Sequence, residues 1–136
     1  NWEMEKIRTT CTYCGVGCQV YLHVKDGRII KVTGVEGAEP NLGSLCVKGR
    51  FGYEFVHSPE RLTTPLIKEN GEFRPASWAE ALDLAARRFL EIKREHGPDS
   101  LAGLTSARAT NEENYLMQKL VRAGFGTNNI DHCARL

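Results

Sequence analysis

The chain has 136 residues, and 18 basic side chains against 17 acidic ones leave a formal net charge of +1. Hydrophobic residues make up 41% and charged residues 26%, a mix typical of a globular protein that excludes a disordered one. The balanced charge gives no long-range attraction to nucleic acid or to an anionic membrane, and no apolar run approaches the roughly 18 residues of a membrane span.

Three of the five cysteines, Cys11, Cys14 and Cys18, fall within eight residues near the start of the chain. Cys46 follows after a gap of 27 residues. The odd number of cysteines does not suit a disulfide-rich domain. A turn and a later loop can instead bring four thiolates to one centre, and this spacing favours a [4Fe–4S] cluster of the electron-transfer kind. A structural zinc site is the alternative, although zinc usually takes two CxxC pairs and the chain contains one.

Two strands are expected directly after the cysteine turn. Residues 19–24 and 29–35 alternate apolar and polar side chains around Asp26-Gly27, a strong hairpin signal. The cysteines should therefore lie at the edge of a small antiparallel sheet. Residues 36–45 contain glycine and proline, and they predict a loop that leads to the fourth cysteine.

The second half of the chain changes period. A second hairpin is expected over residues 66–75, with Asn-Gly at its turn. A capping box at Ser77 and Glu80 predicts the start of a helix that continues to Gly97. Residues 100–105 resemble a short buried strand.

A second capping box, Thr110 with Glu113, opens another helix that should run to Gly124. The order of strand, loop and helix indicates the start of an α/β layer. We expect the aromatic and methionine side chains of the two helices to lie in the core, namely Trp78, Phe89 and Met117.

The expected fold is thus mixed α+β and α/β, with a small antiparallel β module over residues 1–60 and the beginning of an α/β domain over residues 61–136. One strand and two helices cannot close a doubly wound sheet. The chain is therefore predicted to be the N-terminal piece of a larger protein.

The four cysteines, followed by Val47-Lys48-Gly49-Arg50, resemble the N-terminus of molybdopterin-dependent oxidoreductases. Within that family the chain most resembles the catalytic (alpha) subunit of formate dehydrogenase, and residues 75–82, 106–115 and 126–135 agree. Many molybdopterin enzymes share the cysteine motif, whereas the run over 127–135 is more specific to the formate branch. The resemblance covers nearly the whole chain.

The resemblance implies the cofactors and the division of the chain. Cys11, Cys14, Cys18 and Cys46 would hold a [4Fe–4S] cluster in an iron–sulfur domain over residues 1–60. Residues 61–136 would begin the domain that binds molybdenum or tungsten as bis-molybdopterin guanine dinucleotide.

The resemblance also implies roles for two cations. Lys48 matches the lysine between cluster and pterin that helps electrons to pass, and a cation so close to a ligand offsets the thiolate charge. Arg108, which precedes a helix N-terminus, is a candidate contact to a pterin phosphate or dinucleotide. Arg135 matches a position close to the metal. Without the resemblance, a solvated surface position is the simpler interpretation of Lys48, and a surface or helix-capping role is as good for Arg108.

The catalytic ligand of the family is expected just beyond this sequence. In formate dehydrogenases a cysteine or selenocysteine that binds the metal comes directly after a segment like Ala134-Arg135-Leu136, and a histidine follows it. No catalytic residue of that motif is therefore expected within the chain. A UGA selenocysteine codon read as a stop is one explanation, and a cloned fragment or part of a longer chain are the others. His132 and Cys133 precede the ligand and are expected to be buried structural residues.

The full-length parent is expected to interconvert formate and CO₂ in the cytoplasm, although the family has periplasmic members. Electrons would pass Lys48 and the cluster to partner iron–sulfur subunits, such as those of a hydrogenase or diaphorase module, while this segment alone would be inactive. A standalone iron–sulfur carrier and the catalytic subunit of nitrate reductase are the alternatives.

Overall fold

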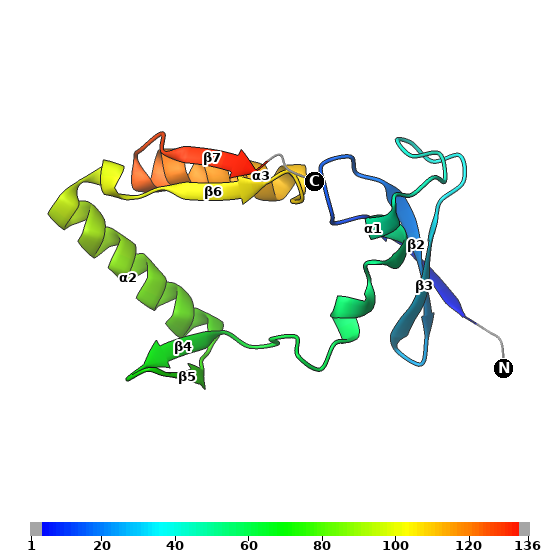
Figure 1. Cartoon of the computed structure of the whole chain (residues 1–136), viewed down its shortest axis with the longest axis horizontal. Coiled ribbons are helices and arrows are strands. Elements are labelled where there is room, and N and C mark those ends of the chain that lie inside the picture. Colours follow the sequence, from blue (N-terminus) through cyan, green and yellow to red (C-terminus); the bar gives the residue numbers. More distant parts are fainter. Residues whose placement is uncertain (1–3, 134–136) are drawn as a thin grey trace. The chain divides into compact units, whose positions relative to one another are not determined.

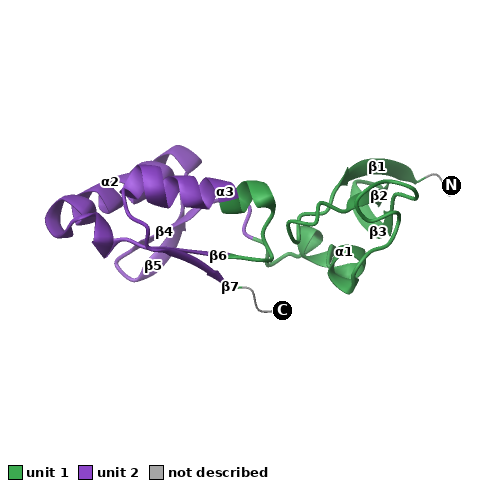
Figure 2. Cartoon of the chain, turned by 90° about the horizontal axis from the view of Figure 1, so that it is seen from above, with its two compact units in different colours: residues 1–61, 106–114, 133–136 green, residues 62–105, 115–132 purple. Residues whose placement is uncertain are grey.

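A computed structural model describes residues 4–133, and the chain divides into two compact units (Figure 2). Unit 1 comprises residues 1–61, 106–114 and 133–136, and unit 2 comprises residues 62–105 and 115–132. All four cysteines of the motif fall in unit 1.

Unit 1 contains an antiparallel sheet of three strands in the order β1-β2-β3 (Figure 1). The expected hairpin is confirmed as β2 (Gln19–Lys25) and β3 (Arg28–Gly34), and its turn residues Asp26 and Gly27 have φ of 50° and 73°. The sequence did not predict β1 (Glu5–Thr10), because charged and threonine side chains mask its alternation and every residue of it is exposed.

Two short helices follow the loop and pack onto this sheet. They are α1 (Val47–Phe51) and the 3₁₀ helix η1 (Glu54–His57). The Tyr53 hydroxyl donates to the carbonyl of Ile30 at 2.8 Å, and the N–H of Ile29 donates to Nε2 of His57 at 2.8 Å. These bonds hold residues 53–57, which include η1, against β3.

Unit 2 begins with the predicted hairpin, β4 (Leu66–Glu69) and β5 (Glu72–Pro75), followed by α2 (Trp78–His96). Ser77 caps α2 by accepting the N–H of Glu80 at 3.1 Å. The Glu80 carboxylate instead pairs with Arg74 at 2.6 Å, so only half of the expected capping box forms. Neither α2 nor any other helix within residues 4–133 has both the length and the apolar character that crossing a membrane requires.

The α/β layer starts after the 3₁₀ helix η2 (Pro98–Ser100), and its first strand begins at Gly103, three residues later than expected. Its elements are β6 (Gly103–Ser106), α3 (Asn111–Lys119), the π-helix η3 (Leu120–Phe125) and β7 (Ile130–Cys133). The N–H groups of Gly103 and Ala107 donate to the carbonyls of Asn129 and Cys133, at 2.8 and 3.0 Å. Both strands therefore run in the same direction, as a strand–helix–strand unit requires (Figure 1).

The core of unit 2 is smaller than the helix patterns suggested. Leu101, Val121 and Phe125 form the buried cluster, with Ile92 and Ile130 packed against it. The prediction of core positions was wrong for Trp78, which is 68% exposed, and for Phe89, which is 42% exposed. A sheet of two strands covers little of a long helix, so much of the apolar surface of α2 is uncovered within the part of the chain that the structure describes.

Candidate functional site

The first three cysteines lie on a turn that joins β1 to β2. Cys11 follows β1 and Cys18 precedes β2, where Thr10 and Gln19 form the last cross-strand pair. The N–H of Cys11 donates to the carbonyl of Cys18 at 2.8 Å and closes the turn. Gly17 has φ of 73°, a conformation that suits glycine and few other residues. The cysteine turn therefore sits at the end of the sheet, where the sequence placed it.

Cys46 is the N-cap residue of α1. The N–H of Gly49 lowers the pKa of its thiol, partial burial opposes this shift, and the N–H and ammonium of Lys48 lower the pKa further. A helix N-terminus favours a thiolate for the same reason that it favours other anions. The fourth cysteine is thus held where backbone donors stabilise a negative sulfur.

The other three thiols of the motif act electrostatically on Cys18. Burial raises the pKa of Cys18, and the charges of Cys11, Cys14 and Cys46 raise it further. The Sγ of Cys11 also lies only 3.5 Å from the place that a Cβ on Gly49 would occupy. The turn and the N-terminus of α1 therefore lie close together, and all four cysteines are free thiols.

This set of donors fits an iron–sulfur cluster in its chemistry. Four thiols, backbone N–H groups beside sulfur and a neighbouring cation are the groups that hold and tune such clusters. Among residues 4–133, no three His, Cys, Asp or Glu side chains are placed around a single metal ion. In a [4Fe–4S] cluster each thiolate binds a different iron atom.

Two polar side chains that the sequence did not indicate, Asn41 and Tyr13, fix the cysteine loops through hydrogen bonds. The amide of Asn41 accepts the N–H of Gln19 at 2.7 Å and donates to the carbonyl of the same residue at 3.2 Å. It also donates to the carbonyl of Ser44 at 2.9 Å. The hydroxyl of Tyr13 donates to the carbonyl of Gly52. The loop before Cys46 is thereby attached to the residue after Cys18, and the cysteine turn to the end of α1.

A hollow of about 320 Å³ lies beneath the cysteine turn, between the sheet and the short helices. Its lining is mostly apolar and includes Cys11, Tyr13, Val20 and Phe55. The phenol of Tyr13 and the ring of Phe55 meet edge to face at 6.4 Å. One of the four sulfurs therefore borders a region of low polarity.

The two expected cations both belong to unit 1. Lys48 is half-buried at the second position of α1, where its ammonium influences Cys46. Arg108 is exposed in the turn between β6 and α3, and its N–H donates to the Ser106 hydroxyl at 3.1 Å. The guanidinium of Arg108 forms no ion pair with any residue from 4 to 133.

The start of α3, beside Arg108, carries the capping box that the sequence predicted. The hydroxyl of Thr110 accepts the N–H of Glu113 at 3.2 Å, and the carboxylate of Glu113 accepts the N–H of Thr110 at 2.7 Å. This complete capping box already satisfies donors at the helix start.

The prediction that His132 and Cys133 are buried was wrong, since both are exposed on β7. A strand at the edge of a sheet of two strands has little to cover it. Arg135 and the position after Leu136 lie outside the described residues.

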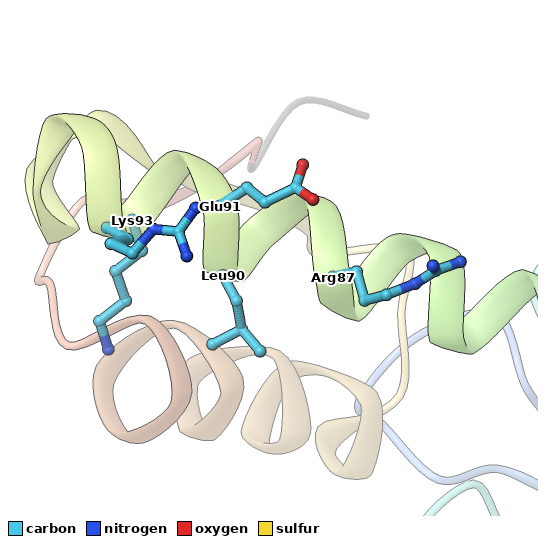
Figure 3. Close-up of a pocket in the computed structure, with 5 residues that line it drawn as sticks. Arg87, Leu90, Glu91 and Lys93 are labelled. Atoms are coloured by element: carbon cyan, nitrogen blue, oxygen red, sulfur yellow. The ribbon is translucent and has the colours of Figure 1, made fainter.

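A second hollow, of about 580 Å³, lies along α2 in unit 2 (Figure 3). Leu90 and Lys93 point from α2 toward the neighbouring helix, and Nζ of Lys93 donates to the carbonyl of Gly124 at 3.1 Å. Its lining of Arg87, Leu90, Glu91, Lys93 and Arg94 contains no cysteine and none of the candidate residues.

Two family models match the chain. The model described as "Molybdopterin oxidoreductase Fe4S4 domain" matches residues 4–58, and the model described as "Molybdopterin oxidoreductase" matches residues 61–136. The chain belongs to the molybdopterin oxidoreductase family. These two domains indicate a 4Fe–4S cluster and a molybdopterin cofactor.

Curated relatives match nearly the whole length of this chain. A protein of Bacillus subtilis named "Probable oxidoreductase" is 55% identical over 133 residues, which is 98% of this chain and 14% of the relative. A protein of Staphylococcus aureus strain MRSA252 named "Putative formate dehydrogenase" is 48% identical over the same shares of both chains. The chain therefore spans about one seventh of the length of these relatives.

Proposed function

We propose that the chain is the N-terminal part of a formate dehydrogenase catalytic subunit, with Cys11, Cys14, Cys18 and Cys46 as ligands of its [4Fe–4S] cluster. The observation that carries the cluster assignment is that the segment with these four cysteines matches the Fe4S4 domain, and that Sγ of Cys11 lies beside Gly49 in the helix that Cys46 caps. The substrate rests on the name of the Staphylococcus aureus relatives. The division of the protein at residue 60 is part of the same proposal.

The residues near the cysteines have distinct tasks in this proposal. The thiolates bind iron, and the N–H groups of Lys48 and Gly49 stabilise the negative sulfur of Cys46. The Lys48 ammonium favours the more negative, reduced state of the cluster and so raises its reduction potential. Arg108 is proposed to bind a phosphate of the pterin cofactor. The pterin-bound metal would supply the two-electron interconversion of formate and CO₂, and iron–sulfur subunits would accept the electrons.

The substrate is tested on the full-length protein that contains this segment, purified without oxygen. Formate oxidation is measured with an oxidised dye and nitrate reduction with a reduced dye. Activity with formate alone supports the proposal. Activity with nitrate alone overturns the substrate and leaves the cluster ligands standing.

The role of Lys48 is tested by Lys48→Ala, with Lys48→Arg as the matched variant that keeps the charge. We expect K48A to lower the reduction potential of the cluster. It should also lower kcat while leaving KM nearly unchanged, because electron transfer follows substrate binding. K48R should stay closer to the unmodified enzyme. Equal potentials in all three proteins would contradict this role.

A further inference from the structure

Asn111 links the cysteine turn to a segment almost a hundred residues away. Its Nδ2 donates to the carbonyl of Gly15 at 2.9 Å, and the two residues are 96 positions apart. Gly15 lies between Cys14 and Cys18, and a Cβ at this position would collide with Oδ1 of Asn111. The side chain of Asn111 therefore occupies the space that the missing Gly15 side chain leaves.

The start of α3 holds the backbone of Asn111 in place, independently of the contact with the cysteine turn. Asn111 is the first residue of α3, directly after Thr110 of the complete capping box. Nδ2 of Asn114 donates to the carbonyls of Ser106 and Thr110, at 3.2 and 3.1 Å, and fastens the preceding loop to the same helix. The donor amide thus projects from a helix start whose own hydrogen bonds hold it in place.

The turn that Asn111 contacts contains two glycines, Gly15 and Gly17. Glycine loses more backbone freedom on ordering than any other residue. Inside residues 11–18, the hydrogen bond from Cys11 to Cys18 closes the ends of the turn. A bond from outside at Gly15 restrains its middle, next to Cys14.

We propose that Asn111 is a positioning residue that holds the Cys14–Cys18 turn in the shape that retains the cluster. The inference rests on the proposed role of the four cysteines as cluster ligands. Asn111 also lies three residues after Arg108. The start of α3 therefore provides Asn111, which contacts the cysteine turn, and follows closely on Arg108, the proposed contact to the pterin cofactor.

The first test compares Asn111→Asp with Asn111→Ala in the full-length protein. Asp has the shape of Asn but no N–H donor, and an acid at a helix start favours the helix. If Asn111 served only α3, N111D would behave like the unmodified protein. As a positioning residue it should fail in both variants, because the carboxylate faces the Gly15 carbonyl.

The readouts are the rate of cluster loss in air and the electron paramagnetic resonance spectrum of the reduced cluster. We expect about fivefold faster loss in N111A, the factor that corresponds to one hydrogen bond, and a changed spectrum in both variants. Asn128→Ala is the matched control, since Asn128 is an exposed asparagine in unit 2. A spectrum and loss rate for N111D equal to those of N128A would overturn the proposal.

Gly15→Ala provides an independent arm. Its Cβ must displace Asn111, so G15A should resemble N111A, and the double variant should be no worse than either single one. Additive effects would overturn the proposal. An unmodified protein without a [4Fe–4S] signal would instead refute the proposed function, so the two failures remain distinguishable.

Discussion

The cysteine region of unit 1 and the helical part of unit 2 are held together in different ways. In unit 1, side-chain amides and a phenol bond to backbone groups of distant segments, as Asn41, Tyr13 and Asn111 do. In unit 2, a small apolar cluster around Val121 and Phe125 joins helix to sheet. Unit 2 also has an amide bonded to distant backbone, since Nδ2 of Asn129 donates to the carbonyls of Asp99 and Leu101 at 3.0 and 3.4 Å. These bonds supplement a buried cluster that includes Leu101, whereas those of unit 1 lie at the loops that carry the cysteines.

The largest effect is expected in unit 1, where a single cysteine substitution should remove the whole proposed cluster. Cys18→Ala should abolish the proposed cluster, with a loss of about four iron and four sulfide per chain, because one of its four proposed thiolate ligands is removed. Cys133→Ala is the matched control, since Cys133 is exposed at the end of β7. Iron and sulfide analysis of purified proteins measures both. Equal iron in C18A and C133A would remove the chemical basis of the comparison.

Unit 2 should respond most to a loss of buried area. Val121 is 0% exposed, so Val121→Ala is expected to lower the free energy of unfolding by about 2 kcal/mol. Leu104→Ala, at a position that is 79% exposed, should change it little. Denaturant unfolding followed by circular dichroism compares the two. A smaller effect for V121A than for L104A would show that the cluster does not stabilise this unit.

The two helix caps give a smaller and graded effect. The Thr110 hydroxyl accepts the N–H of Glu113 and also donates to the Glu113 carboxylate, whereas the Ser77 hydroxyl accepts only one N–H. Thr110→Ala should lower the free energy of unfolding by about 1 kcal/mol, and Ser77→Ala should lower it less. Denaturant titrations of both variants test the ranking. The reverse order would show that the bond from the Thr110 hydroxyl to the Glu113 carboxylate contributes nothing.

The smallest effect is a dependence on pH. Hydrogen bonds from the N–H and then the hydroxyl of Thr110 hold the pKa of Glu113 below its usual value. A lowered folded pKa means that this stabilisation is complete above about pH 4.3, the ordinary pKa of Glu, and is lost as the pH falls through the folded value. Glu113→Gln should flatten the fall in stability between neutral and acidic pH. An unchanged slope in E113Q would contradict this assignment.

The sequence predicted elements whose signals are local. Asp26-Gly27 fixes its hairpin because both residues adopt positive φ, and Ser77 marks the start of α2. The order of strand and helix after residue 100 indicated the α/β layer. The cysteine spacing predicted a candidate cluster, because the chain has only five cysteines and their thiolates are distinctive metal ligands.

The contacts between distant segments lay beyond the sequence. An asparagine in a glycine-rich loop, such as Asn41, has no local pattern that marks it as a link to Gln19. The exposure of Trp78 and His132 depends on what covers α2 and β7 and not on their spacing. β1 was missed because its pairing with β2, and not an apolar face, makes it a strand.

The close approach of Gly34 and Gly43 has a consequence for how the cluster would be assembled. The Gly43 carbonyl fills the space of a side chain on Gly34, and Asn41 binds both backbone groups of Gln19. Bringing Cys46 to Cys18 through an unstructured loop would cost entropy that grows with loop length. Here the hairpin and this contact have already restricted the 27 intervening residues. They act as a folded spacer, which would hold Cys46, as the proposed fourth ligand, near Cys18 at a smaller entropy cost than an unstructured loop.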